Sequence, residues 1–286
     1  MKKVTVPDIL SKKEKGEKIT QLTAYDFPSA QLVDKAGIDM ILVGDSLGTV
    51  VLGYENSLPV TVDDIVHHTR PVARGAKRAL IVGDLPFMAY HVSIEDTIRN
   101  SGRIIKSGGA DAVKLEGGKE VAGKVNALVE AGIPVQAHVG LMPQRAAVLG
   151  GLRVQGVEAE AGVSIIEDAV TLEEAGAFSI VLEFVTAEVA QIITETLSIP
   201  TIGIGSGPSC DGQVLVLHDL LGVYKKNPPF ARKYVDLREI ITKALSDYGE
   251  DVRDGTFPGT EHTFHMDAEE KQRLAALLKA RKLAMK

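Results

Sequence analysis

Eight short apolar runs, separated by amphipathic stretches, constrain the fold of this chain more than any other sequence feature. Near-continuous apolar runs of this length are typical of parallel strands that are buried on both faces. Eight strand–helix units are also the number that closes an α/β barrel. The sequence therefore predicts an α/β protein, a (β/α)8 TIM barrel. The expected strands are 19–24, 40–43, 80–82, 112–115, 135–139, 179–182, 201–204 and 213–217.

Helix signals lie between these runs. Thr61 and Ser93 precede acidic first turns, as N-cap residues do. Ala-Gly or Gly-Gly pairs end several stretches, as glycine does just past a helix. An open doubly wound sheet is the alternative, but no G-x-G-x-x-G follows the first strand. The expected helices are 28–36, 62–76, 94–106, 120–130, 160–174 and 187–196.

The predicted organisation also includes two long connections within the barrel and a helical segment after its last strand. Segments 47–60 and 140–158 are too long for plain turns and are apolar, so we expect lids or subunit contacts there. Beyond residue 219 the chain carries the break KKNPP at 225–229 and helix-like segments at 237–245 and 268–283. We interpret residues 1–286 as one barrel domain with a C-terminal helical appendage at about 219–286.

Composition excludes several classes of function. The formal net charge is -6, so no basic surface for nucleic acid is expected. Cys210 is the single cysteine, which excludes an internal disulfide and points to a reducing compartment. The first twenty residues lack the apolar centre of a secretory signal, and no apolar run has the length of a membrane helix. We therefore expect a soluble, cytoplasmic protein.

Nearly every predicted strand ends on an ionisable or hydrogen-bonding side chain. In barrels of this type, the carboxyl ends of the strands face the active-site mouth. Asp45, Asp84 and Glu116 end three consecutive strands, so a shared Mg²⁺ ion would satisfy them together. The alternative is that each carboxylate caps a helix or pairs with a nearby cation. The residues at the strand ends are Tyr25, Asp26, Asp45, Ser46, Asp84, Lys114, Glu116, His138, Glu183, Ser206, His218 and Asp219.

Four of these residues have more than one open role. Lys114 and Glu116 flank Leu115, so both point to the same face of a strand. Lys114 then neutralises a substrate carboxylate, forms a Schiff base, or pairs with Glu116. Glu183 has the character of a general base, unless it pairs with a cation on a neighbouring strand. His138 donates a hydrogen bond to Glu183 or to substrate, or is a satisfied core histidine.

Ser206 lies in the glycine run GIGSGP. Such a run either cradles a phosphate or permits tight packing of the barrel.

At these residues the sequence resembles the ketopantoate hydroxymethyltransferase family over about residues 4–265. The matching motifs, in order, are LTAYDFPSA, MILVGDSLG, GDLPF, KLEGG, AHVGLMPQ, LEFV and IGIGSGPSCDGQVLVLHDLLG. One departure is Ser206, where the family pattern leads us to expect alanine. The resemblance implies a (β/α)8 barrel, and an enzyme that transfers a hydroxymethyl group from 5,10-methylenetetrahydrofolate to 3-methyl-2-oxobutanoate. The product is 2-dehydropantoate (ketopantoate), an intermediate of pantothenate biosynthesis.

The resemblance also implies roles for individual residues, a magnesium-stabilised enolate and a homodecamer of two stacked pentamers. We expect folate near segment 47–60. The implied roles are Mg²⁺ ligands at Asp45, Asp84 and Glu116, oxo-acid binding at Asp45, Ser46, Asp84 and Lys114, and proton acceptance at Glu183.

Three other functions are compatible with parts of the sequence. A Mg²⁺-dependent carbon–carbon lyase or phosphonate mutase would share the barrel, but such enzymes usually carry a cysteine in a lid, whereas Cys210 lies between the last two strands. A Schiff-base aldolase acting through Lys114 needs no metal and leaves the three carboxylates unexplained. A catalytically silent barrel that binds a small acid has no need of Glu183.

Overall fold

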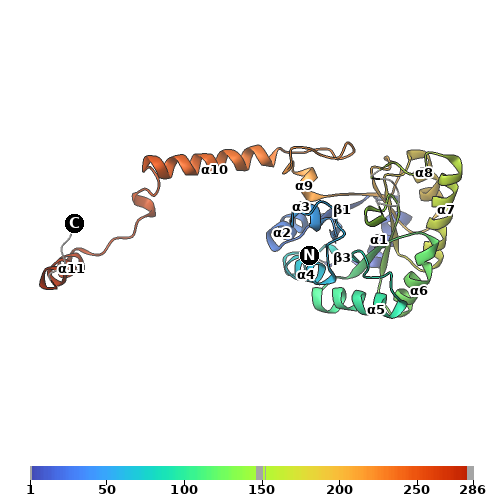
Figure 1. Cartoon of the computed structure of the whole chain (residues 1–286), viewed down its shortest axis with the longest axis horizontal. Helices are drawn as coiled ribbons and strands as arrows, with labels where there is room; N and C mark the ends of the chain where they lie inside the picture. The colour runs from blue at the N-terminus through green and yellow to red at the C-terminus, as the bar shows by residue number, and fades with distance from the viewer. Residues whose placement is uncertain (1, 146–150, 152, 282–286) are drawn as a thin grey trace. The chain divides into compact units, whose positions relative to one another are not determined.

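Eight parallel strands form a closed barrel in the computed structural model, which describes residues 2–145, 151 and 153–281 (Figure 1). Each strand pairs with the next along the chain, and β8 pairs with β1. The predicted (β/α)8 barrel is confirmed. The strands are β1 (Ile19–Thr23), β2 (Met40–Val43), β3 (Leu80–Asp84), β4 (Ala112–Glu116), β5 (Val135–Gly140), β6 (Ser179–Glu183), β7 (Thr201–Ile204) and β8 (Gly212–Leu215).

Side chains alternate between the inside of the barrel and the layer under the helices. In β4, Val113 and Leu115 belong to the large cluster that packs under the helices, whereas Ala112 belongs to the smaller cluster inside the barrel. Because successive side chains on a strand point to opposite faces, Lys114 and Glu116 share the inner face with Ala112. The predicted common face of Lys114 and Glu116 is therefore confirmed.

A helix follows each of the first six strands, as predicted. Thr61 accepts a hydrogen bond from the Asp64 backbone N–H and Ser93 accepts one from the Asp96 backbone N–H, so both are N-caps. The helix after β3 continues into a π-helical turn at Ile104–Gly108. Segment 205–211 joins β7 directly to β8 without a helix. These helices are α2 (Phe27–Lys35), α4 (Val62–Gly75), α5 (Ile94–Arg103), α6 (Ala122–Glu130), α7 (Ala159–Glu174) and α8 (Ala187–Thr196).

The N-terminal helix α1 (Val6–Glu14) was missed by the sequence analysis. Ile9 is fully buried and belongs to the cluster inside the barrel. Lys12 forms an ion pair with Asp39 at the start of β2, and Lys13 forms one with Asp211 at the start of β8. The helix therefore closes the amino end of the barrel.

A polar layer fills the barrel interior above α1. The side-chain amide of Gln136 donates to Ser179 Oγ over 3.1 Å, and that of Gln21 donates to Gln136 Oε1 over 3.1 Å. All three side chains are buried. The barrel is thus a packed core and not a pore, as is usual for this fold.

Each of the two long connections begins with a short helical element. Segment 47–60 begins with α3 (Leu47–Val50), and a turn of 3-10 helix (Pro143–Arg145) begins the connection after β5. Part of segment 140–158, where a lid or a subunit contact is predicted, lies outside the described residues. A third short helix, α9 (Leu217–Leu220), follows β8.

The chain divides into two compact units, Met1–Val235 and Asp236–Lys286. The second unit contains α10 (Leu237–Asp254), a 3-10 turn (Thr260–His262) and α11 (Ala268–Ala280). Helix α10 extends beyond the end predicted at residue 245, and α11 corresponds to the segment predicted at 268–283, of which 282 and 283 lie outside the described residues. Among the described helices, none combines the length and the apolar character needed to cross a membrane.

Candidate active site

The carboxyl ends of β2 to β6 bring six ionisable side chains together, and we call this group the acidic cluster. The strand register places Asp84 beside Lys114 and Glu116 beside His138, so these groups lie on one rim of the barrel. Asp84 and Glu116 are 1% exposed and Asp45 is 6% exposed. The members of the acidic cluster are Asp45, Asp84, Lys114, Glu116, His138 and Glu183.

Lys114 pairs with Asp84, and its Nζ lies 2.9 Å from Asp84 Oδ1. Pairing with Glu116 was one of three roles of Lys114 that the sequence left open. The register explains the choice, because Asp84 is the direct neighbour of Lys114 on the adjacent strand. Burial favours the neutral amine, but the carboxylates of Asp84, Glu116 and Asp45 outweigh it and raise the pKa of Lys114 above its ordinary range. The lysine is therefore a permanent cation.

The carboxylates of the cluster exceed its cations. Burial raises the pKa of Asp84 to about 7, and the nearby Asp45 acts in the same direction, although Lys114 opposes both. Burial also raises the pKa of Glu116 well above its ordinary value. A buried group of like charges is costly unless a counter-charge balances it. The cluster therefore either retains protons or binds a cation.

His138 links two of the carboxylates. Its Nε2 lies 3.3 Å from Glu183 Oε2, and its Nδ1 lies 3.7 Å from Glu116 Oε1. Burial lowers the pKa of His138, and the Lys114 ammonium, whose Nζ is 3.5 Å from Nδ1, lowers it further. The His138 imidazole beside Glu183 is therefore neutral. The Glu183 side chain is 20% exposed, which makes this carboxylate more accessible than the 2% exposed Glu116 side chain.

Ser46 and Ser206 make different kinds of contact. The Ser46 hydroxyl lies 2.9 Å from the hydroxyl of the buried Tyr25 and is next in sequence to Asp45. Ser206 Oγ donates to the Leu182 carbonyl and accepts a hydrogen bond from the Val185 N–H, which brackets Glu183. Because Ser206 is buried and committed to backbone groups, tight packing explains the glycine run better than a phosphate cradle does.

The other predicted strand-end residues lie beside the cluster or have structural roles. Asp26 caps α2 by accepting a hydrogen bond from the Ser29 N–H. The His218 ring packs 5.6 Å from the Tyr25 ring, and burial lowers the pKa of this histidine. Burial raises the pKa of Asp219. None of the three contributes an ion pair to the acidic cluster among the described residues.

Gln144 and Tyr90 contact the cluster but were not identified from the sequence. The Gln144 side-chain amide donates to Asp45 Oδ2, and its backbone N–H donates to Glu116 Oε2. The Tyr90 hydroxyl donates to Gln144 Oε1. The available signal was one polar residue in the apolar stretch GLMPQ directly after β5.

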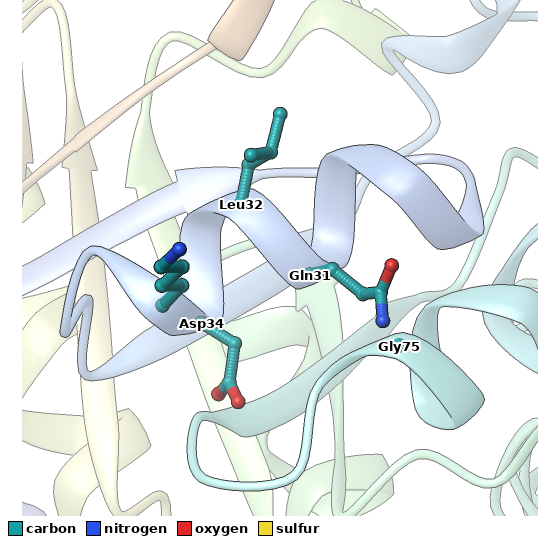
Figure 2. Close-up of a pocket in the computed structure, with 5 residues that line it drawn as sticks. Gln31, Leu32, Asp34 and Gly75 are labelled. Atoms are coloured by element: carbon teal, nitrogen blue, oxygen red, sulfur yellow. The ribbon is translucent and has the colours of Figure 1, made fainter.

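A hollow of about 380 Å³ on the outer surface of the barrel lies away from the carboxyl ends of the strands (Figure 2). Asp34 points into this region, but its carboxylate accepts hydrogen bonds from the backbone N–H groups of Lys77, Arg78 and Ala79. That carboxylate anchors the turn before β3 and is engaged with backbone groups. Its lining residues are Gln31, Leu32, Asp34, Lys35 and Gly75.

The acidic cluster fits a magnesium site that is completed by water and substrate. Within the described part of the chain, no three His, Cys, Asp or Glu side chains form a ready-made metal cage. Mg²⁺ commonly takes only one or two carboxylates and keeps several waters. Asp45, Asp84 and Glu116 offer hard oxygen ligands of this kind. Burial raises the pKa of Asp84 and of Glu116, so their ionised forms need more counter-charge than Lys114 supplies, and a bound cation would provide it.

A closed α/β barrel with a buried, ionisable cluster at the carboxyl ends of its strands is the arrangement of a barrel enzyme. The sequence identifies the family. The family model described as ketopantoate hydroxymethyltransferase matches residues 3–260. This chain belongs to the ketopantoate hydroxymethyltransferase family.

Three similar relatives carry the name 3-methyl-2-oxobutanoate hydroxymethyltransferase. The protein from Ignicoccus hospitalis is 57% identical over 259 residues, covering 91% of this chain and 98% of the relative. The protein from Staphylothermus marinus is 55% identical over 273 residues, covering 96% and 100%. The protein from Heliobacterium modesticaldum is 54% identical over 271 residues, covering 94% and 98%.

Solved structures of other enzymes share the fold. Phosphonopyruvate hydrolase superposes with a TM-score of 0.61 at 13% identity, covering 99% of this chain and 100% of that chain. The same enzyme has been solved with oxalate and Mg²⁺, at 15% identity and a TM-score of 0.61. A 2,3-dimethylmalate lyase superposes with a TM-score of 0.57 at 16% identity, covering 97% and 96%. At this level of identity the similarity concerns the fold alone.

Proposed function

We propose that this protein transfers a hydroxymethyl group from 5,10-methylenetetrahydrofolate to 3-methyl-2-oxobutanoate and forms 2-dehydropantoate. The observation that carries the proposal is the acidic cluster itself, in which buried carboxylates surround the single cation Lys114 next to the more accessible Glu183. A small 2-oxo acid requires such a combination, because its carboxylate must be held, its C3 proton removed and the resulting enolate stabilised.

Lys114 is the group that holds the substrate carboxylate. It is protonated and buried, so it offers a strong and well-positioned positive charge. The Ser46 hydroxyl, which lies 2.9 Å from the Tyr25 hydroxyl, is the second candidate for binding the substrate carboxylate. Ser46 directly follows Asp45 in sequence. Two fixed contacts orient the acid before the reaction, and orientation of this kind lowers the barrier. An ion pair is preferred to a Schiff base because Asp84 keeps the amine protonated.

Glu183 is the proton acceptor at C3 of the acid. Its carboxylate is the more accessible one, and the neutral His138 lies beside it, with Nε2 3.3 Å from one of its oxygens. A positioned base typically contributes about two to four orders of magnitude to the rate. His138 acts as the orienting partner, and it takes part in the movement of the proton after Glu183 has received it.

Asp45, Asp84 and Glu116 are the residues that would hold Mg²⁺. When bound, the ion supplies Lewis acidity that stabilises negative charge developing on the keto oxygen. The excess of buried carboxylates in this chain supports the assignment. The phosphonopyruvate hydrolase that shares the fold has been solved in complex with oxalate, a small dicarboxylate, and Mg²⁺.

Segment 47–60 is our candidate for the folate site. Val51, Leu52 and Tyr54 on this segment are large apolar side chains that remain exposed next to the mouth residues Asp45 and Ser46. An apolar ring system would cover such side chains. A cytoplasmic location, which the single cysteine and the sequence of the first twenty residues favour, and a homodecamer, which the family resemblance implies, complete the proposal.

The deciding experiment measures C3 proton exchange of 3-methyl-2-oxobutanoate in D₂O by NMR. We expect EDTA to abolish exchange and Mg²⁺ to restore it. We also expect Asp84→Ala to lower the rate by about two to three orders of magnitude, the usual loss when one preorganised electrostatic stabiliser is removed. Asp39→Ala is the matched control, because Asp39 is an equally buried carboxylate at the opposite end of the barrel.

Three results would contradict the proposal. Full exchange in EDTA would favour the Schiff-base aldolase, and a protein that binds the acid without any exchange would be a silent binder. Cleavage of a carbon–carbon bond without a folate donor would instead indicate a lyase. The structure already weakens that last possibility, since Cys210 is buried.

A further inference from the structure

The side chain of Gln144 lies between two of the candidate metal ligands. Its Nε2 donates to Asp45 Oδ2 over 3.0 Å, and the backbone N–H of the same residue donates to Glu116 Oε2 over 3.3 Å. Gln144 is 4% exposed, so water does not compete for these bonds. One residue after β5 thus holds a carboxylate from the end of β2 and another from the end of β4.

The network around Gln144 fixes the orientation of its amide. The second hydrogen of Nε2 is donated to the Leu85 carbonyl over 3.0 Å, and Oε1 accepts from the Tyr90 hydroxyl over 3.0 Å. A flipped amide would place its oxygen against the Asp45 carboxylate and the Leu85 carbonyl, which are both acceptors only. The donor side of Gln144 therefore always faces Asp45.

Hydrogen bonds to Asp45 and Glu116 also hold together two groups that repel each other. Asp45, Asp84, Glu116 and Glu183 all bear negative charge when ionised, and Lys114 is paired with Asp84. Without a bound cation, free side chains of like charge would turn away from one another. Gln144 keeps one oxygen of Asp45 and one of Glu116 engaged, and leaves the other oxygen of each carboxylate for a ligand.

We propose that Gln144 is a positioning residue that preorganises Asp45 and Glu116 for a divalent cation, with Tyr90 setting the orientation of its amide. The inference rests on the proposed function, because it concerns the same magnesium site. Partners that orient the ligands of a metal contribute about 10- to 100-fold to metal affinity or activity.

The test measures Mn²⁺ binding to the full chain without substrates, by the electron paramagnetic resonance signal of free Mn²⁺. Mn²⁺ accepts the same oxygen ligands as Mg²⁺. Gln144→Met keeps the length of the side chain and removes its amide hydrogen bonds, including the one to Asp45, while the backbone N–H that reaches Glu116 remains. We expect the dissociation constant to rise by about 10- to 100-fold. Gln21→Met is the matched control, since it removes the amide bonds of an equally buried glutamine in the layer below and should leave the constant unchanged.

Tyr90→Phe provides a second and milder variant, because it removes a single oxygen atom. Losing one neutral hydrogen bond corresponds to about a 2- to 10-fold rise in the dissociation constant. It also serves if Gln144→Met fails to fold, as judged by circular dichroism. Unchanged Mn²⁺ affinity in both folded variants would overturn the positioning role of the Gln144 side chain while leaving the metal site intact. If the unmodified protein binds no Mn²⁺, the magnesium site of the proposed function is wrong, and the positioning role falls with it.

Discussion

Replacing Asp84 by asparagine should change how the stability of the metal-free protein depends on pH. Asp84 has a pKa of about 7 in the folded chain, against an ordinary value of 3.8, because it is buried and lies near Asp45. A carboxyl whose pKa is raised by folding holds its proton more tightly in the folded state. Its stabilising contribution is complete below the unfolded pKa and is lost as the pH rises through the folded pKa.

The magnitude follows from these two values. Between pH 5 and pH 8 the folded protein must give up the Asp84 proton, whereas the unfolded chain has largely lost it already. The linked change in the free energy of unfolding is about 2 to 3 kcal/mol, and Asp84→Asn removes it. Between pH 5 and pH 8, the free energy of unfolding of the unmodified protein should therefore fall by about 2 to 3 kcal/mol more than that of the variant.

Urea denaturation followed by circular dichroism, in EDTA and at one fixed protein concentration, measures this difference at both pH values. Asp39→Asn is the control. Burial alone would raise the pKa of Asp39, but hydrogen bonds from Thr20 and Lys12 outweigh burial and lower it, so its contribution is constant above pH 5. Added Mg²⁺ should reduce the pH-dependent difference in the free energy of unfolding between the unmodified protein and Asp84→Asn. Parallel stability curves for the unmodified protein and Asp84→Asn would refute the reasoning and show that Lys114 keeps Asp84 ionised throughout.

Three further predictions concern the remaining groups. Glu183→Gln should slow C3 exchange in D₂O by about two to four orders of magnitude while oxo-acid binding stays the same, and near-normal exchange would place the base elsewhere. Lys114→Ala should weaken oxo-acid binding by about 2 to 5 kcal/mol in calorimetry. Borohydride and substrate should add no mass to the unmodified protein, since an adduct on the lysine would restore the Schiff-base alternative. Ile9→Ala should lower the free energy of unfolding by about 2 to 5 kcal/mol without changing Mn²⁺ affinity, and a loss of affinity would show that α1 influences the site.

The barrel and most of the acidic cluster could be predicted because both follow from short-range patterns. Continuous apolar runs mark strands that are buried on both faces, and the strand ends of a barrel lie on one rim. Because successive side chains of a strand point to opposite faces, the sequence of β4 predicted that Lys114 and Glu116 share one face of that strand. The ion-pair partner of Lys114 was not predictable in the same way, since it depends on the register between β3 and β4, which aligns Asp84 with the lysine.

Helix α1 and the role of Gln144 were not predicted, because both depend on contacts between segments that are far apart in the sequence. Ile9 is the single fully buried residue of α1, and the surface that buries it exists only after the barrel has closed. Gln144 is uncharged and lies after β5, and its partners Asp45 and Glu116 come from the ends of β2 and β4. Contacts that join several loops have no local sequence pattern, so they emerge only from the folded chain.

Closure of the amino end by α1 has a kinetic consequence. Ile9 and the polar layer of Gln21, Gln136 and Ser179 block that end, so substrates and products use one entrance at the carboxyl ends of the strands. An acid bound at Lys114 lies deeper than the exposed side chains of segment 47–60. If folate binds on segment 47–60 as proposed, the donor would lie above the acid and cover the entrance at the carboxyl ends of the strands. We expect compulsory order, in which the oxo acid arrives first and the hydroxymethylated acid leaves after the spent folate.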